Sequence, residues 1–277
     1  MRSIKKLIIA SAGAMLMAQG AYAGLTYNNG DLILGFRKAG ASSNLEVDLG
    51  SVTQIRDLVG WNGTTALGPG GTISFSQFTA GDITAGVGSA GSGSLNNAIW
   101  SVSGAVNLAG QVTGANKNTL WLTSARDNAA LNTQSTPWTR ASSTTQGNTV
   151  SPVLSVGTGF AAATGNAGST TAAVIADGSN SYHDNITDNG NFNAFGGNIE
   201  NTLGATFTTD ATKARSDLYE MQPGSGNGTY LGYFELTSAG ALSFVAVPEP
   251  GLFGVGIAAG LMVITLARAH RKSEANS

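Results

Sequence analysis

Apolar and polar residues alternate along several short segments of this chain. Leu45, Val47 and Leu49 alternate with two acidic residues, which predicts a half-buried strand with an acidic outer face. The apolar run at residues 31–37 follows an Asn-Asn-Gly turn signal, so we expect the two segments to pair as a hairpin across residues 40–44. Further strands are predicted at residues 73–78, 98–104, 119–124, 229–237 and 241–247.

Tryptophans mark the centres of two of these predicted strands. Trp100 lies in residues 98–104 and Trp121 in residues 119–124, and a polar, Gly-containing segment separates them. We expect the two strands to pair in a β-meander and both indole rings to fill the core. The last two predicted strands are joined by Ser-Ala-Gly, which suits a second hairpin.

Other parts of the chain give weaker patterns. Residues 81–94 are rich in Gly, Ala and Ser and are interpreted as a loop, whereas residues 209–221 begin with Thr-Asp and predict a short capped helix. Residues 126–181 hold clusters of Ser, Thr, Asn and Gln that indicate surface loops, with strand or helix at residues 152–160 and 171–176. No single assignment follows for this stretch.

The pattern as a whole predicts an all-β fold. We expect a β-sandwich or jelly-roll-like body with long loops and one short helix at residues 24–246, in which the first and last strands are neighbours. Two segments of different composition flank this body, residues 1–23 and residues 247–277.

Residues 1–23 have the composition of a secretory signal peptide. Three cations precede a 12-residue apolar stretch, and Ala21 and Ala23 form a small-x-small cleavage site before Gly24. The apolar stretch is too short for a typical spanning helix. We expect the general secretion machinery to export the chain and signal peptidase to remove this segment.

Residues 247–277 predict a membrane-directed tail. It opens with four hinge residues, Val247, Pro248, Glu249 and Pro250. The two prolines forbid regular backbone pairing, which leaves an accessible extended segment. The uncharged apolar run at residues 251–267 is 17 residues long, the lower limit for a single transmembrane helix.

A basic segment, residues 268–277, follows the apolar run. Its cations are Arg268, Arg271 and Lys272. Cations beside a span are retained on the cytoplasmic side of the membrane, so everything before Val247 is expected outside.

The tail resembles the PEP-CTERM sorting signal of Gram-negative bacteria that make exopolysaccharide. The resemblance covers Val247 to Lys272 and rests on Pro-Glu-Pro, a short apolar helix and a basic end in that order. It implies recognition by an exosortase, a membrane transpeptidase-like enzyme, and cleavage near Pro248 to Pro250. The body would then be released or attached at the cell surface or in the extracellular matrix. An ordinary single-pass tail anchor is the alternative.

The body also resembles a recurring type among proteins with this signal. The resemblance rests on residues 30–37, on the two Trp-containing strands, and on residues 217–221 followed by residues 232–236. That type has no established activity, so the resemblance implies placement and fold rather than chemistry.

Charge separates the body from its two ends. Of the 14 Lys and Arg in the chain, six lie outside residues 24–250, which leaves eight against 15 Asp and Glu and a formal charge of −7. An acidic body with no basic cluster argues against nucleic-acid binding. Cysteine is absent, so the fold has no disulfide and the protein has no thiol nucleophile or Cys-based metal site.

Catalytic residues are not predicted. His183 is the one histidine of residues 24–246, and it lies in a polar context without any Gly-x-Ser-x-Gly elbow in the chain. The 15 carboxylates allow many pairings and so do not single out a glycosidase site. We therefore expect a protein that is not an enzyme.

One polar segment has the composition of a cation site. Asp184, Asp188 and Asn191 place oxygen ligands close to a Gly, which suits a hard cation such as Ca²⁺. The spacing is not that of an EF-hand, and the Glu at its twelfth position is missing. An Asx-rich turn accounts for the same residues and is the favoured interpretation, so no cofactor is predicted.

Two further tryptophans are candidates for contact with sugars. Trp61 and Trp138 lie beside turn-like residues, where an exposed indole can stack on a sugar ring. The leading hypothesis is a non-enzymatic secreted protein of the cell surface or extracellular matrix, sorted by exosortase and associated with exopolysaccharide. A lectin-like carbohydrate-binding module is the alternative, and a secreted hydrolase is the third hypothesis.

Overall fold

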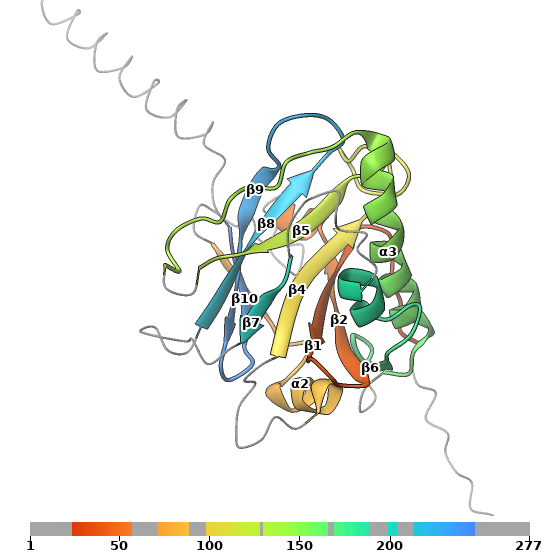
Figure 1. Cartoon of the computed structure of the whole chain (residues 1–277), viewed down its shortest axis with the longest axis vertical. Coiled ribbons are helices and arrows are strands. Elements are labelled where there is room, and N and C mark those ends of the chain that lie inside the picture. The colour runs from red at the N-terminus through yellow and green to blue at the C-terminus, as the bar shows by residue number, and fades with distance from the viewer. Residues whose placement is uncertain are drawn as a thin grey trace, which may run out of the picture.

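The computed structural model describes residues 24–56, 71–88, 98–127, 130–165, 169–188, 199–203 and 213–246. Within these residues the fold is mostly β, as predicted: one curled, sandwich-like antiparallel sheet with few helices (Figure 1). The strands are β1 Asp31–Arg37, β2 Ser43–Ser51, β3 Thr72–Phe75, β4 Ala98–Ala105, β5 Leu120–Ala125, β6 Ala172–Ala176, β7 Asn201–Leu203, β8 Lys213–Met221, β9 Thr229–Thr237 and β10 Leu242–Ala246. The helices are α1 Thr53–Arg56, α2 Ala80–Val87, α3 Ser143–Ala162 and the π-helix η2 Asp184–Asp188.

The sheet divides at β4. The strand order is β3-β10-β9-β8-β5-β4-β1-β2-β6, and β7 pairs with the first half of β4 while β5 pairs with its second half. Thr123 of β5 lies at the fork: its hydroxyl accepts a 3.1 Å hydrogen bond from Val102 N and lies 3.0 Å from the Ile199 carbonyl oxygen. This side chain therefore satisfies backbone groups where the two halves of the sheet separate.

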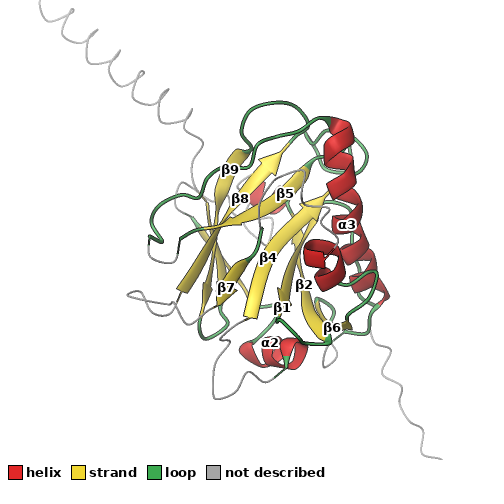
Figure 2. Ribbon diagram, viewed as in Figure 1, coloured by secondary structure: helices red, strands yellow, loops and turns green. Residues whose placement is uncertain are grey.

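Each face of the curled sheet buries a separate apolar core. The inner core contains Trp100, Trp121, Phe36 and Phe234, and α2 closes one end of it. The outer core lies between the sheet and α3, which runs along the sheet in Figure 2. Since both faces are covered, strands near the fork are buried on both sides, which is unusual for a sheet built of hairpins.

Several predicted elements are confirmed. The hairpin of β1 and β2, the pairing of β4 with β5, and the closing hairpin of β9 and β10 all form with antiparallel register. Trp100 and Trp121 are fully buried, as expected for tryptophans at strand centres.

The helix predicted at residues 209–221 is wrong. Residues 213–221 form β8, paired on one side with β5 and on the other with β9. Leu218 enters the inner core and Met221 the outer core. A three-residue spacing can place two apolar residues on one side of a helix, but in a strand it places them on opposite faces.

One helix was not predicted, and another is longer than the stretch at residues 152–160 for which helix was one of two alternatives. Residues 81–94 were expected to be a loop, yet α2 begins with a capping box between Thr79 and Asp82. Gly86 allows this helix to lie against Leu45, because a Cβ there would be 2.5 Å from the Leu45 Cβ. The 20-residue α3 occupies part of the unassigned stretch; Ser142 caps it, and its buried positions recur at helical spacing despite many Ser, Thr and Gly.

The first and last strands are not neighbours in the sheet. β1 lies between β4 and β2, whereas β10 lies between β9 and β3, so the expected adjacency is wrong. The predicted signal peptide at residues 1–23 and tail at residues 247–277 lie outside the described residues. Among the residues that the structure describes, no helix is both long and apolar enough to span a membrane.

Candidate functional site

A cluster of buried and half-buried polar side chains lies on the outer face of β1, β2 and β4. We call it the Tyr182 cluster, and it consists of Arg37, Glu46, Ser101, Tyr182 and Glu200. Residues 177–188, which follow β6 and include η2, cover this part of the sheet and are called the cover segment. Arg37 and Glu200 form a two-pronged ion pair, with Nε to Oε1 at 2.7 Å and Nη2 to Oε2 at 2.6 Å.

Tyr182 connects the cover segment to the sheet. Its hydroxyl lies 3.0 Å from Glu200 Oε1, to which it donates, and 2.5 Å from the Ser101 Oγ. The ring packs against Gly35, where a Cβ would be 2.1 Å from the ring carbon Cδ2. Burial, followed by the negative charge of Glu200, raises the pKa of the Tyr182 phenol well above its usual value.

Glu46 holds the same segment through its backbone. Its Oε1 accepts a 2.7 Å hydrogen bond from the Tyr182 N–H, while its Oε2 is buried without a hydrogen-bond partner among the described residues. Burial raises the pKa of Glu46 well above its usual value, and only the Tyr182 N–H opposes that shift. The acidic outer face predicted for this strand is therefore wrong at Glu46, which is fully buried.

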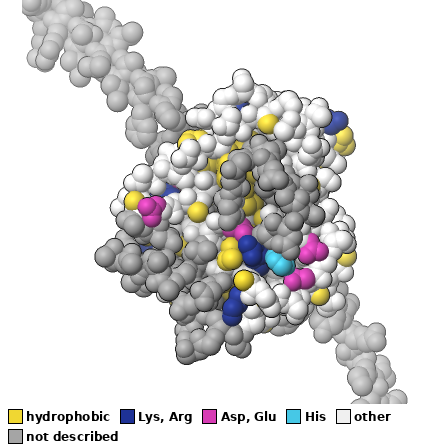
Figure 3. Space-filling view, in the orientation of Figure 1, with side chains coloured by type: hydrophobic (Ala, Val, Ile, Leu, Met, Phe, Trp, Pro, Cys, Tyr) yellow, Lys and Arg dark blue, Asp and Glu magenta, His cyan; other side chains and the backbone are white. Residues whose placement is uncertain are grey.

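His183 lies at the exposed margin of the Tyr182 cluster. Its Nδ1 is 3.1 Å from Asp177 Oδ2, and both side chains remain partly accessible. Figure 3 shows a histidine on this face beside basic and acidic side chains. The Asp177 carboxylate also lies 3.4 Å from Asn44 Nδ2, so the pair helps to join the cover segment to β2.

The chemistry of the cluster favours a structural role. A phenol whose pKa is raised stays protonated, so Tyr182 is suited to donate a hydrogen bond and not to act as a base or nucleophile. Glu200 is engaged by Arg37 and Tyr182 together. These groups are arranged to hold one another and the cover segment in place.

A second buried network fixes the connection between β5 and α3. Arg126 donates to Asp217 Oδ1 at 2.7 Å and to the Tyr230 hydroxyl at 2.7 Å. The other Asp217 oxygen accepts the Ser135 N–H at 2.6 Å. The Arg126 guanidinium lies 4.2 Å from the centre of the Tyr233 ring. In a chain without cysteine, this network attaches the long surface connection to β8.

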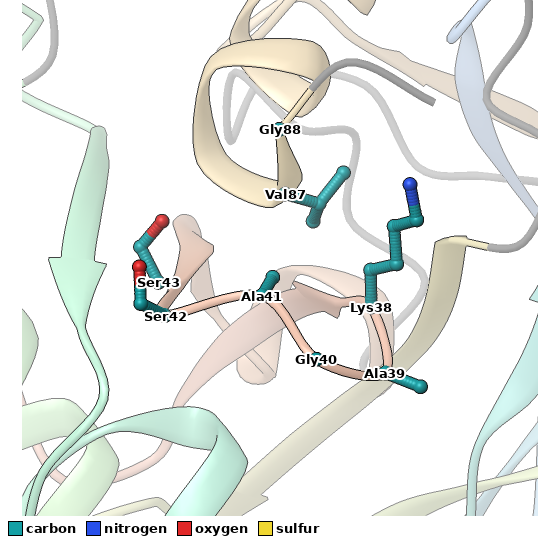
Figure 4. Close-up of a pocket in the computed structure, with 8 residues that line it drawn as sticks. All are labelled: Lys38, Ala39, Gly40, Ala41, Ser42, Ser43, Val87 and Gly88. Atoms are coloured by element: carbon teal, nitrogen blue, oxygen red, sulfur yellow. The ribbon is translucent and has the colours of Figure 1, made fainter. Parts of the chain in front are cut away.

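A shallow hollow of about 330 Å³ lies between the β1–β2 loop and the end of α2. It is lined by Lys38, Ala39, Gly40, Ala41, Ser42, Ser43, Val87 and Gly88. Figure 4 shows the Lys38 side chain rising from the loop alongside Val87, with Ala39 pointing away. The Ser43 hydroxyl already donates to the Gly86 carbonyl oxygen at 2.7 Å, so Lys38 and Ser42 are the polar side chains left to meet a solute.

The structure places the predicted sugar-stacking residues differently from expectation. Trp138 is only 8% exposed, packs in the outer core, and donates its Nε1–H to the Thr123 carbonyl oxygen at 3.0 Å. Its prediction as an exposed aromatic is therefore wrong, because the connection from β5 folds back over the sheet and carries the indole inward. Trp61 lies outside the described residues.

The predicted cation site is only partly described. Asp184 begins η2, but the side chain of Asp188 and all of Asn191 lie outside what the structure describes. Within the described part of the chain, no three His, Cys, Asp or Glu residues are grouped so that they could hold a metal ion. The Asp184 N–H donates to the Ser181 Oγ at 3.2 Å, which is a turn of the Ser/Asx kind.

Sequence reasoning missed the members of the Tyr182 cluster. Arg37, Tyr182 and Glu200 are far apart in the chain, and no local motif joins them. A charged residue within an apolar strand, such as Glu46, was the available signal, since such residues are rarely buried without a partner. The chain matches no protein-family model, no curated protein and no solved structure in the comparisons made.

Proposed function

We propose that this chain is a non-enzymatic secreted protein of the cell surface or extracellular matrix, sorted by an exosortase and associated with exopolysaccharide. The observation that carries the proposal is the order of the tail at residues 247–277: Pro-Glu-Pro hinge, apolar run, basic end. The inner membrane holds the precursor only transiently through this tail.

The limits of the packed domain support processing at both ends. Leu25, two residues after the predicted signal peptidase site, is buried in the outer core. At the other end, β10 finishes at Ala246, which is buried and donates its N–H to the Gly71 carbonyl oxygen at 2.9 Å. Cleavage before Gly24 and near Pro248 would therefore leave these contacts in place.

The position of β10 suits a domain that is cut close to its last strand. β10 pairs with β9 on one side and β3 on the other. A strand held on both edges does not fray readily when the chain beyond it is lost. The hinge prolines also prevent the strand from continuing towards the membrane.

A display role agrees with the way the buried polar groups are used. Within the Tyr182 cluster, Arg37 pairs with Glu200; within the Arg126 network, Arg126 pairs with Asp217, which also accepts a backbone N–H. Such networks suit a domain that must stay folded outside the cell without disulfides. The formal charge of −7 on residues 24–250 disfavours adsorption to anionic lipid once the tail is removed.

Cell fractionation tests the proposal. The full chain is expressed in a Gram-negative strain with its exosortase and in the same strain without it, and the protein is followed in membrane, surface and culture fractions. We expect surface or matrix protein in the first strain and membrane-retained protein in the second. A variant with Pro248→Ala and Pro250→Ala should behave as in the second strain, whereas Pro223→Ala, in a surface turn, should not.

Incubation with the strain's own polysaccharide separates the proposal from its alternatives. We expect the secreted protein to be retained with matrix and to release no sugar. Saturable binding to one defined glycan would favour a lectin-like module in place of general matrix association. Release of reducing sugar would contradict the non-enzymatic role.

A further inference from the structure

Glu46 differs from the two other buried carboxylates discussed above, Glu200 and Asp217, in its partners. Glu200 is paired with Arg37, and Asp217 is paired with Arg126. Glu46 is fully buried, accepts one backbone N–H, and leaves its second oxygen without a partner among the described residues. A carboxylate in such a place is costly when charged, so the neutral acid is the form that the fold accommodates.

Among the described residues around Glu46, each cation already has another partner. The titratable or charged residues described on the elements packed around it are Asp31 and Arg37 on β1, Asp48 on β2, Asp177, Tyr182, His183 and Asp184 on the cover segment, Glu200 before β7, and Asp82 on α2. The sequences of α3, β4 and β6 contain no charged residue. Arg37 is already engaged by both oxygens of Glu200, and His183 is next to Asp177.

The described hydrogen bond of the Glu46 carboxyl group joins it to the cover segment. The carboxyl group accepts a hydrogen bond from the backbone N–H of Tyr182. The ring and hydroxyl of the same residue attach the cover segment to the sheet. An ionised Glu46 could be rehydrated only if water reached the space beneath Tyr182. The cover segment would have to move for this to happen.

We propose that Glu46 is a pH-sensitive latch, which holds the cover segment against β2 when it is protonated and releases it when it ionises. The direction follows from linkage. A group that binds its proton more tightly in the closed form stabilises that form at low pH, and the stabilisation is lost as the pH rises through the pKa of the closed form. Between the pKa of the open form, about 4.3, and the pKa of the closed form, the equilibrium constant for opening rises about tenfold per pH unit, and above the second value it levels off.

Hydrogen exchange of the full chain, purified in detergent, tests the latch. The protection factor of the Tyr182 amide is measured from pH 5 to pH 9 and compared with amides of β2. We expect Tyr182 protection to fall as the pH rises, by up to about tenfold per pH unit, and to stay below the protection of the β2 amides, which reports global unfolding. Constant protection of Tyr182, or protection equal to that of the β2 amides at every pH, would overturn the proposal; the second result would mean that the cover segment opens only by global unfolding.

Two variants separate the latch from simple packing. Glu46→Gln keeps an oxygen for the Tyr182 N–H and cannot ionise, so its Tyr182 protection should not depend on pH. Glu200→Gln is the matched control: it removes the ion pair with Arg37 and should lower protection at every pH while leaving the pH dependence. An unchanged pH dependence in Glu46→Gln would assign the effect to another group.

A direct titration keeps the proposal testable if Glu46→Gln fails to fold. In the wild-type chain labelled with ¹³C at the Glu side-chain carboxyl, the Glu46 resonance should titrate above the ordinary Glu pKa of about 4.3. Titration at or below that value would contradict the latch.

Discussion

The ring of Tyr182 occupies the space that a side chain on residue 35 would need: a Cβ at Gly35 would lie 2.1 Å from Tyr182 Cδ2. Gly35→Ala should therefore displace Tyr182 and with it the cover segment. Overpacking of this kind costs about 1–3 kcal/mol, and the ring has Ser101 and Glu200 on its hydroxyl to resist a shift. Urea unfolding measures the loss.

Gly178→Ala is the matched control for this change. It lies in the same cover segment, and a Cβ there would meet nothing within 4 Å. Its effect should stay within about 0.5 kcal/mol. Equal effects of the two substitutions would show that Tyr182 does not depend on the missing side chain at residue 35.

The buried pair of Arg126 and Asp217 should be far more sensitive than a surface pair. Asp217→Asn leaves a guanidinium buried without its countercharge, and breaking such a pair costs about 3–5 kcal/mol. Lys213→Met removes a partner of Glu235 at a position that is 40% exposed and should cost no more than about 1 kcal/mol. Thermal and urea unfolding of the two variants would disprove this account if both losses were small.

Trp138 should matter for stability and not for contact with sugars. Trp138→Ala removes a buried ring and its hydrogen bond to Thr123, for which we expect a loss of about 3 kcal/mol or more. Retention of the folded variant with polysaccharide should equal that of the wild type. Leu108→Ala, at a side chain that is 56% exposed, is the control for both measurements. If Trp138→Ala were as stable as the wild type but were retained less by polysaccharide, Trp138 would be a sugar contact after all.

Asp48 should make the domain less stable as the pH rises. Burial raises its pKa to about 7; the Gly50 N–H opposes this shift, and the charge of Asp31 adds to it. The folded form therefore binds this proton more tightly than the unfolded chain, so stability is greatest below about pH 4 and falls as the pH rises to 7. We expect Asp48→Asn to remove about 2 kcal/mol of the decline between pH 4 and pH 8, after allowance for partial exposure.

Urea unfolding at several pH values checks the Asp48 prediction. The part of the decline that remains in Asp48→Asn belongs to Glu46 and Asp31, whose pKa values burial also raises. Leu108→Ala, which removes no titratable group, should leave the pH profile unchanged. A stability that increases from pH 4 to pH 7 would contradict the sign of the effect.

Local sequence patterns were sufficient for the hairpins and insufficient for the elements between them. An apolar run beside an alternating segment predicted β1 with β2, and alternation predicted β9 with β10; in each case a short turn joins the two strands. α3 could not be predicted in the same way, since its Ser, Thr and Gly have low helix propensity. Its helical structure is stabilised by packing on the outer face of the sheet, which the local sequence does not show. β8 was mistaken for a helix because both of its faces are buried.

The candidate site was harder to predict than the strands and helices, because it is built from long-range contacts. Arg37 and Glu200 are 163 residues apart, and Tyr182 joins them only after the cover segment has folded onto β1. Trp138 was misplaced for a similar reason: turn-like neighbours predicted exposure, but the connection held by Arg126 and Asp217 turns its indole inward. Residue types and spacing alone do not contain these relationships.

The intact mass of the protein isolated from the cell surface or culture fluid of an exosortase-bearing strain tests the central claim most directly. The proposal predicts a chain that starts at Gly24 and ends between Pro248 and Pro250. In the strain without exosortase, the mass should include the basic residues up to Lys272 and beyond. A surface or secreted product that still contains Arg271 in the exosortase-bearing strain would contradict it.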